Sequence, residues 1–353
     1  MRYKLSAPAT LHTTIQLPAS KSISNRALIL HALAQGHIAP SNLSDCDDTR
    51  VMIKALDGNP GHIDILAAGT AMRFLTAYLS VTPGTRIITG TERMQQRPIR
   101  ILVDALRELG AQIEYAGKEG FPPLRITGTE LTGEEISLAG NVSSQYISAL
   151  LMIGPILKNG LRLNLTGEII SRPYINLTLQ LMKEFGADAA WSSKSSITVR
   201  PGKYRDIPFT VESDWSGASY WYQMVALIQD NEKKESTKTE IKLPGLLPRS
   251  YQGDSRGAEI FAKLGVHTTY TDQGVILTKM GTPVTCLKED LVDIPDLAQT
   301  FVVTCCLMNI PFRFTGLQSL KIKETDRIQA LITELNKLGY VVKSEQDSIL
   351  IWN

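Results

Sequence analysis

The 353-residue sequence has no apolar run long enough for a membrane-spanning helix, which needs about 18 or more such residues. Its first 18 residues lack the continuous apolar core of a secretory signal peptide. Lys and Arg (37) nearly balance Asp and Glu (35), so the net charge is only +2, and no overall field favours nucleic acid or a lipid surface. We therefore expect a cytoplasmic protein with no membrane and no nucleic-acid partner.

Cysteine and histidine are scarce, at four and five residues. Cys46, Cys286, Cys305 and Cys306 have no CxxC spacing, and the histidines form no HExxH motif, so nothing predicts a metal site. We expect free, buried thiols in a reducing compartment. The chain also lacks GxGxxG, GxxxxGK and GxSxG, the signals of dinucleotide, P-loop and α/β-hydrolase sites. The sequence therefore predicts neither a metal nor a cofactor.

Two kinds of segment alternate along the chain, which is long enough for about two domains. One is an amphipathic helix that ends in Leu-Gly or Phe-Gly and precedes two short strands. The other is a more uniformly apolar helix with a polar first turn, often followed by a turn and a strand. The first kind occupies residues 97–128, 172–201, 256–278 and 326–351, with a shortened copy after 47, and the second has polar starts at 21–26, 69–70, 143–145, 216–219 and 296. This alternation predicts a repeated α/β building block, with residues 229–240 as a solvated loop.

The polar starts share a chemistry that SKSISNRALIL, residues 20–30, shows best. Lys21, Ser22 and Arg26 lie where a helix begins, and a helix start offers unpaired N–H groups and a positive dipole end to an anion. The alternative is an ordinary N-cap with two solvated cations. Because the pattern recurs at five equivalent positions, an anion-binding cleft is the better interpretation.

Seven motifs, in this order, carry a family resemblance: LPASKSISNRALIL, AGTAMRFL, RMQQRPI, SSQYISALLM, SRPYINLTLQLM, DIPDLAQTFVV and IKETDRIQAL. Together they resemble the 5-enolpyruvylshikimate-3-phosphate synthase family over essentially the whole chain. The resemblance implies an α/β (α+β) two-lobed enolpyruvyl transferase fold of repeated βαβαββ units, with the active site in the interlobe cleft. One lobe would comprise residues 18–211, with three units. The other would comprise 1–17 and 212–353, with two of three units.

The implied reaction transfers the enolpyruvyl group of phosphoenolpyruvate to the 5-hydroxyl of shikimate 3-phosphate, with release of phosphate. This step belongs to the biosynthesis of chorismate and aromatic amino acids and is the target of glyphosate, and the enzyme is expected to be a monomer. The two substrates bring about five to six negative charges into one site. Charges a few ångströms apart interact at several kcal/mol in a partly desolvated site, so several cations must converge there.

The resemblance assigns roles to individual residues. Asp296 would hold or deprotonate the 5-hydroxyl, and Glu324 would donate a proton to the methylene carbon; with Lys21 they form the catalytic set. The residues implied for shikimate 3-phosphate are Ser22, Arg26, Ser143, Ser144, Gln145, Ser171, Tyr174, Asp296 and Lys323. Those implied for phosphoenolpyruvate are Lys21, Gly69, Arg97, Gln145 and Arg327.

Several of these residues also have an ordinary structural interpretation. Thr325 could cap the helix that KETDR begins, Asp296 could be another N-cap, and Tyr174 could pack in a core. Arg73 and Arg100 lie beside the motifs, and we expect both on helix surfaces.

The sequence departs from the family pattern at three internal positions. Ala67 replaces a usual Asn, Phe74 stands where Pro is common, and Ser319 stands where an Asn often contacts the shikimate phosphate. The family pattern also continues into a sixth unit, whereas this sequence ends at Asn353. We expect a chain that truly ends there to bind shikimate 3-phosphate weakly, if at all, and to release no phosphate.

Two other functions stay open. A UDP-N-acetylglucosamine enolpyruvyl transferase would share the fold and phosphoenolpyruvate, but it uses a mobile-loop cysteine, and residues 93–99 contain none. A non-catalytic anion-binding protein is the alternative from another class.

Overall fold

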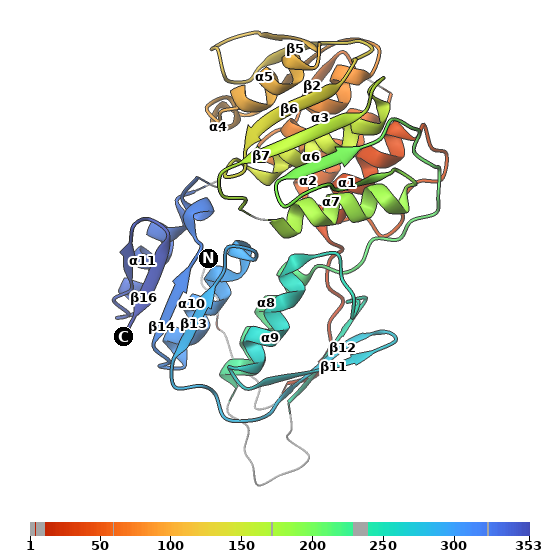
Figure 1. Cartoon of the computed structure of the whole chain (residues 1–353). Helices are drawn as coiled ribbons and strands as arrows, with labels where there is room; N and C mark the ends of the chain where they lie inside the picture. Colours follow the sequence, from red (N-terminus) through yellow and green to blue (C-terminus); the bar gives the residue numbers. More distant parts are fainter. Residues whose placement is uncertain (1–3, 5–10, 59, 171, 229–238, 323–324) are drawn as a thin grey trace. The chain divides into compact units, whose positions relative to one another are not determined.

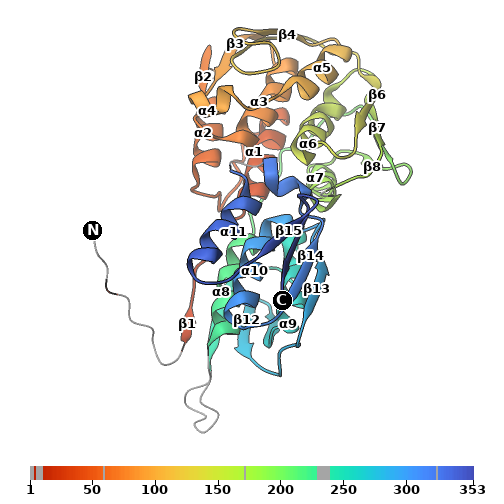
Figure 2. The same ribbon diagram turned by 90° about the vertical axis from the view of Figure 1, so that its left-hand side faces the viewer.

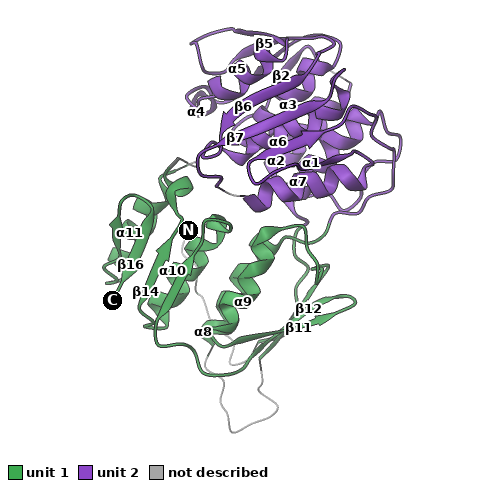
Figure 3. Ribbon diagram, in the orientation of Figure 1, with its two compact units in different colours: residues 1–18, 212–353 green, residues 19–211 purple. Residues whose placement is uncertain are grey.

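A computed structural model describes residues 4, 11–58, 60–170, 172–228, 239–322 and 325–353. Three expected site residues, Ser171, Lys323 and Glu324, lie outside these ranges, as does nearly all of the expected loop at 229–240. The chain divides into two compact units (Figure 3). Unit 1 comprises Met1–Pro18 and Glu212–Asn353, and unit 2 comprises Ala19–Val211, limits one residue away from the expected ones.

Unit 2 contains two four-stranded sheets, and their helices and strands can be followed in Figure 1. The first sheet has the order β2-β3-β5-β4, and the second has the order β6-β7-β9-β8. The strands are β2 (His62–Asp64), β3 (Gly84–Thr89), β4 (Gln112–Tyr115), β5 (Leu124–Gly128), β6 (Glu134–Ala139), β7 (Leu161–Thr166), β8 (Ala189–Trp191) and β9 (Ser196–Val199). The helices are α1 (Lys21–Leu33), α2 (Asp47–Leu56), α3 (Gly69–Val81), α4 (Glu92–Gln95), α5 (Arg100–Glu108), α6 (Ser144–Ile153), η1 (Gly154–Ile156) and α7 (Arg172–Glu184).

Unit 1 also contains two four-stranded sheets, with the orders β1-β10-β12-β11 and β13-β14-β16-β15. The strands are β1 (His12–Thr14), β10 (Glu240–Pro244), β11 (Val266–Thr271), β12 (Gly274–Lys279), β13 (Leu287–Asp290), β14 (Phe312–Thr315), β15 (Lys343–Glu345) and β16 (Ile349–Trp352). The helices are α8 (Trp215–Leu227), η3 (Gly253–Arg256), α9 (Gly257–Ala262), η4 (Pro295–Leu297), α10 (Ala298–Leu307), η5 (Gln318–Ile322) and α11 (Arg327–Lys337). The strand β1 pairs in parallel with β10, with His12 opposite Glu240.

All four sheets follow one plan. In each, the first strand along the chain pairs in parallel with the second, and the last two strands form an antiparallel hairpin that joins the second. In three of the sheets one or more helices lie between the first and second strands, and in all four between the second and third; in the sheet that begins with β1, the whole of unit 2 and α8 lie between the first strand and the second. This βαβαββ order confirms the repeated α/β block expected from the sequence. Among the described residues of unit 2, α1 and α2 are accompanied only by an isolated bridge between Ser41 and Thr210.

The Leu-Gly and Phe-Gly pairs end helices as expected. Gly110, Gly186, Gly265 and Gly339 follow α5, α7, α9 and α11, and their φ angles are 101°, 90°, 84° and 90°. Residues with a side chain rarely adopt this left-handed backbone conformation, whereas glycine adopts it without steric cost. The glycines therefore stop each amphipathic helix and turn the chain into the hairpin that follows.

The two kinds of helix differ in how much of their surface is buried. All but two of the thirteen residues of α3 are buried, whereas α5 buries one stripe, and strands such as β7 alternate buried and partly exposed residues, so each sheet has one face on the helices. In unit 1 a chain of aromatic rings with centroids 4.6–6.5 Å apart crosses the core: Trp215, Tyr222, Phe261, Phe301, Phe314, Phe312 and Trp352. Within the described part of the chain, no helix has the length and apolar character needed to span a membrane.

The four cysteines are free, but they are not all buried. Cys305 and Cys306 are buried in α10, and this burial raises the pKa of both thiols, that of Cys306 to about 11. Cys286 is exposed and Cys46 is half-buried, so the expectation of four buried thiols is wrong for these two. Both precede a regular element rather than lying inside a buried helix.

Candidate active site

Three polar helix starts meet inside unit 2. Helices α1, α3 and α6 pack against one another and lie side by side in Figure 2. Arg26, the sixth residue of α1, lies over the ring of Phe74, the sixth residue of α3, and bonds Ser148, the fifth residue of α6. The first turns of α3 and α6 are also joined, because Gln145 donates to Thr70 Oγ1, and the Arg26 guanidinium reaches back to the Ser22 carbonyl in the first turn of α1. The positive ends of the three helices are therefore gathered in one region of unit 2.

Arg26 is a buried cation at this meeting point. Its side chain is held by a fork of hydrogen bonds: Nε donates to Thr178 Oγ1 (2.7 Å), Nη1 to the Ser22 carbonyl (2.8 Å) and Nη2 to Ser148 Oγ (3.1 Å). Desolvation lowers its pKa to about 10. The interpretation of two solvated cations at the start of α1 is thus wrong for Arg26, whereas Lys21 is exposed.

Two guanidinium groups lie close to Gly69. A Cβ atom built on this glycine would lie 2.6 Å from Arg97 Nη1 and 3.1 Å from Arg73 Nη1. Arg73 is buried and donates from Nη1 to the Gly69 carbonyl at 2.9 Å, so the expectation that Arg73 lies on a helix surface is wrong. Arg100, by contrast, is on the surface and pairs with Glu119 at 2.8 Å.

The start of α6 is joined to the start of α3. Gln145 donates from Nε2 to Thr70 Oγ1 at 3.1 Å, which places its amide beside Gly69. Ser143 is the N-cap of α6 and accepts from the Gln145 backbone N–H at 3.4 Å, and Ser144 is the first residue of the helix. These serines occupy the positions where unpaired N–H groups and hydroxyls face an anion.

Two further expected residues flank the buried arginine. Ser22 is half-buried in the first turn of α1, and its carbonyl accepts a hydrogen bond from Arg26. Tyr174 is half-buried on α7, and its carbonyl accepts from Thr178 Oγ1 at 2.9 Å. Unit 2 thus carries, on or beside the starts of α1, α3, α5, α6 and α7, the expected residues Lys21, Ser22, Arg26, Gly69, Arg97, Ser143, Ser144, Gln145 and Tyr174.

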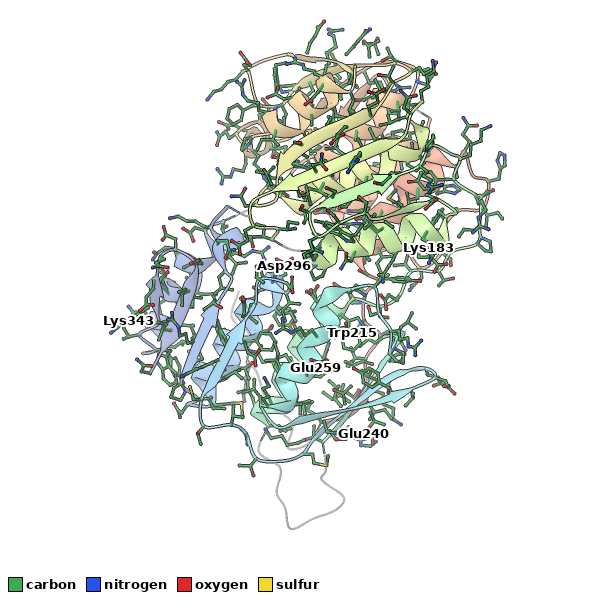
Figure 4. All side chains as sticks on the ribbon, viewed as in Figure 1. Lys183, Trp215, Glu240, Glu259, Asp296 and Lys343 are labelled. Carbon is green, nitrogen blue, oxygen red and sulfur yellow. The ribbon has the colours of Figure 1, made fainter. Side chains whose placement is uncertain are left out.

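Unit 1 carries the expected carboxylate. Asp296 lies in the short helix η4 that leads into α10, and Figure 4 labels it at the beginning of that helix. Its Oδ1 pairs with Arg327 Nη1 at 2.9 Å, with both side chains less than one-third exposed. Since the N-cap of α10 is Leu297, the N-cap interpretation of Asp296 is wrong. The pair joins two expected site residues 31 positions apart.

The start of α11 differs from its expected cap. Asp326, rather than Thr325, is the N-cap and accepts from the Gln329 backbone N–H at 3.0 Å. Lys323 and Glu324 precede this cap outside the described residues.

A second carboxylate in unit 1 had no sequence signal. Glu212 is 7% exposed and accepts from Ser250 Oγ at 2.7 Å, and burial raises its pKa. Among the described residues, no three His, Cys, Asp or Glu side chains are grouped so that they could hold a metal ion.

Comparison with known proteins places this geometry in a family. The profile of "EPSP synthase (3-phosphoshikimate 1-carboxyvinyltransferase)" matches residues 5–58 and 59–353. A 3-phosphoshikimate 1-carboxyvinyltransferase from Bacteroides fragilis is 71% identical over 353 residues, which are 100% of this chain and 84% of that protein. A protein of the same name from Shewanella pealeana is 37% identical over 366 positions, covering 96% of this chain and 83% of its own.

A solved structure has the same fold. The EPSP synthase of Acinetobacter baumannii superposes with a TM-score of 0.75 at 20% identity and covers 98% of this chain and 82% of its own. The fold is therefore the two-lobed enolpyruvyl transferase fold. From the profile match over nearly its whole length and the close relative that matches all of it, the chain belongs to the EPSP synthase (3-phosphoshikimate 1-carboxyvinyltransferase) family.

Proposed function

We propose that this protein transfers the enolpyruvyl group of phosphoenolpyruvate to the 5-hydroxyl of shikimate 3-phosphate and releases phosphate. The observation that carries the proposal is the gathering of helix starts and guanidinium groups around Gly69 and Arg26 in unit 2. Each substrate carries a phosphate and a carboxylate, and guanidinium forks and helix N–H groups bind both. Membership of the family supplies the identity of the two anions.

In the proposed reaction, unit 2 supplies most of the binding groups. The shikimate phosphate and ring are held by Ser22, Arg26, Ser143, Ser144, Gln145, Ser171 and Tyr174 of unit 2 and by Asp296 and Lys323 of unit 1. Phosphoenolpyruvate is held by Lys21, Gly69, Arg97 and Gln145 of unit 2 and by Arg327 of unit 1. Lys21 and Arg97 suit this role because, among the described residues, neither side chain makes a hydrogen bond or an ion pair.

The acid–base steps are assigned to unit 1. Asp296 accepts the proton of the 5-hydroxyl as its oxygen bonds to C2 of phosphoenolpyruvate, while Glu324 protonates C3. In the tetrahedral intermediate C3 is a methyl group. It then returns one proton to the Glu324 carboxylate as the bond from C2 to the phosphate oxygen breaks, which restores the carbon–carbon double bond, and the proton from the 5-hydroxyl leaves with the phosphate. Arg327, paired with Asp296 at 2.9 Å, keeps the carboxylate oriented. Lys21 acts in this scheme by balancing charge on the phosphate.

A coupled assay separates the proposal from its rivals. The full chain is mixed with phosphoenolpyruvate and either shikimate 3-phosphate or UDP-N-acetylglucosamine, and phosphate release is measured. For a polypeptide that carries all the repeat units of the family, we expect release only with shikimate 3-phosphate. Release only with the nucleotide sugar would make the protein a UDP-N-acetylglucosamine enolpyruvyl transferase. Binding of either anion without release in any mixture would indicate a non-catalytic binding protein.

We also infer that the protein acts as a cytoplasmic monomer. Four free cysteines support a reducing compartment, and the residues assigned to the reaction all come from one chain. Size-exclusion chromatography with light scattering tests the second point, with the mass of a single polypeptide expected.

A further inference from the structure

Tyr146 is a buried aromatic residue that has no role in the proposed reaction. It follows Gln145 in the first turn of α6 and is 7% exposed. Its hydroxyl donates to the Pro98 carbonyl at 2.7 Å. Since proline has no backbone N–H, the carbonyl is the only backbone group through which Pro98 can form a hydrogen bond. The side chain of Tyr146, on α6, therefore holds the backbone of Pro98, the residue that directly follows Arg97.

The ring of Tyr146 contacts the other arginine beside Gly69. The guanidinium carbon of Arg73 lies 5.8 Å from the ring centroid, within the range of a cation–π contact. The same Arg73 donates to the Gly69 carbonyl. Tyr146 is thus linked to both arginines beside Gly69: its hydroxyl to Arg97 through Pro98, and its ring directly to Arg73.

The arrangement needs such support, because two like charges lie against one glycine. A guanidinium placed beside another is repelled toward solvent unless its backbone is held. The side chain of Arg97 has no hydrogen-bond or ion-pair partner among the described residues, so only the backbone of its segment holds it. That segment is tied by Arg97 N–H to Met94, by Ile99 N–H to Gly120 and, between them, by Tyr146 to Pro98.

We propose that Tyr146 is a positioning residue that sets Arg97 and Arg73 around Gly69 and so fixes the affinity for phosphoenolpyruvate. The proposal rests on the proposed function, because it takes phosphoenolpyruvate as the anion at Gly69. Tyr146 itself does not touch the substrate. Its effect is therefore expected on the binding of one substrate and not on the binding of the other.

The test removes the hydroxyl alone. Tyr146→Phe keeps the ring under Arg73 but frees the Pro98 carbonyl. We expect the KM for phosphoenolpyruvate to rise about two- to tenfold, the range that the loss of one hydrogen bond gives. The KM for shikimate 3-phosphate should stay within about twofold, since none of the hydrogen bonds that hold the Arg26 guanidinium involves Tyr146.

The chain offers a matched control in Tyr204. It is 5% exposed in the same unit, and its hydroxyl donates to the Met152 carbonyl, also on α6, at 2.7 Å. Tyr204→Phe loses the same kind of bond away from Gly69. It should lower the Tm about as much as Tyr146→Phe does and leave both KM values unchanged. Equal changes in both KM values in Tyr146→Phe, or an equal rise in Tyr204→Phe, would show a structural role only and overturn the proposal.

Calorimetric titration with phosphoenolpyruvate keeps the test independent of turnover. A wild-type chain that binds phosphoenolpyruvate but releases no phosphate would refute the proposed function, and a two- to tenfold weaker affinity in Tyr146→Phe would still support the positioning role. Unchanged affinity in Tyr146→Phe would refute the positioning role alone. A wild-type chain that binds no phosphoenolpyruvate would refute both.

Discussion

Gly69 shows how little space separates the cations of unit 2 from the backbone. Any side chain there must displace the guanidinium groups of Arg97 and Arg73, because a Cβ atom would lie 2.6 Å and 3.1 Å from their Nη1 atoms. We expect Gly69→Ala to raise the KM for phosphoenolpyruvate by roughly tenfold, the effect of losing one charge-assisted hydrogen bond. Gly61→Ala is the control in the same unit, since its Cβ would meet nothing within 4 Å. An unchanged KM in Gly69→Ala would mean that the substrate binds elsewhere.

Asp296 gives a test of the chemistry. Asp296→Asn keeps the shape of the side chain but removes the charge that, in the proposed reaction, accepts the hydroxyl proton. We expect kcat to fall by about two to four orders of magnitude, the usual contribution of a general base. The control is Glu345→Gln, which breaks a pair with Arg313 of the same length, 2.9 Å, in the same unit. That pair is exposed, and such pairs contribute about 0–1 kcal/mol. A kcat loss of similar size in both variants would remove Asp296 from the mechanism.

Glu212 makes a prediction about pH. Burial raises its pKa above the 4.5 of an unperturbed Glu, so the folded chain holds the proton more tightly than the unfolded chain does. The resulting stabilisation is fully present below about pH 4.5 and is lost as the pH rises through the folded-state pKa. Gln does not titrate. The Tm of the wild type minus that of Glu212→Gln should therefore be more positive near pH 4.5 than near neutrality, and thermal melts across that range check the sign.

At the residue scale, the location of a side chain could be predicted from the sequence where it depends only on the residue's place in a helix. Lys21, Gly69 and Ser143 are at helix starts as expected. The burial of Arg73 was not predictable, because it depends on the ring of Tyr146, which is 73 positions away and reaches it only through the packing of α6 on α3. The only local hint was the spacing of Gly69 and Arg73, which lets the guanidinium reach the carbonyl one turn earlier.

The elements of unit 2 are joined through the Arg26 fork. Thr178→Val preserves shape but leaves Nε of a buried cation without its acceptor. Such a loss costs about 1.5–3 kcal/mol, and 1 kcal/mol shifts the Tm of a domain of this size by about 2–4 °C. We expect the Tm to fall by about 3–12 °C in a thermal melt.

Thr76→Val is the matched control for this prediction. Thr76 is also fully buried in unit 2, but its hydroxyl donates to Met72, one turn earlier in its own helix. Its loss should lower the Tm by less. A drop as large as that of Thr178→Val would show that the fork adds nothing beyond a buried hydroxyl.

At the element scale, local signals locate the helices and their ends. The amphipathic stripes and the glycines at positive φ are short-range properties, so the four helix–hairpin segments were predictable from the sequence. Strand pairing is not local. The neighbour of β1 is β10, and no property of residues 12–14 alone selects it from the other strands. Here the resemblance to a family, rather than the pattern of residues, gave the expectation.

For the whole molecule, unit 2 is one continuous stretch of chain with complete sheets. Its ends leave from neighbouring points, because Pro18 on one side accepts a hydrogen bond from Asp214 N–H on the other. We expect a polypeptide of residues 19–211 to fold alone and to melt in one cooperative transition by circular dichroism. A non-cooperative melt would show that its two sheets do not form an independent core.

Unit 1 should behave differently when cut. Residues 212–353 alone lack β1, the edge strand that covers β10. We expect this fragment to melt at a lower temperature than a fusion that carries residues 11–18 as well. Equal melting temperatures would mean that β1 contributes little to the sheet.

The pairing of β1 with β10 also has a consequence for synthesis on the ribosome. His12 emerges 228 residues before its partner Glu240, and at about 5–20 residues per second this interval lasts roughly 10–50 s. During that time the whole of unit 2 is synthesised and can fold, while β1 has no partner strand with which to pair. The first strand to be translated is thus among the last to be placed, and a nascent chain arrested before residue 240 should leave residues 11–18 open to protease.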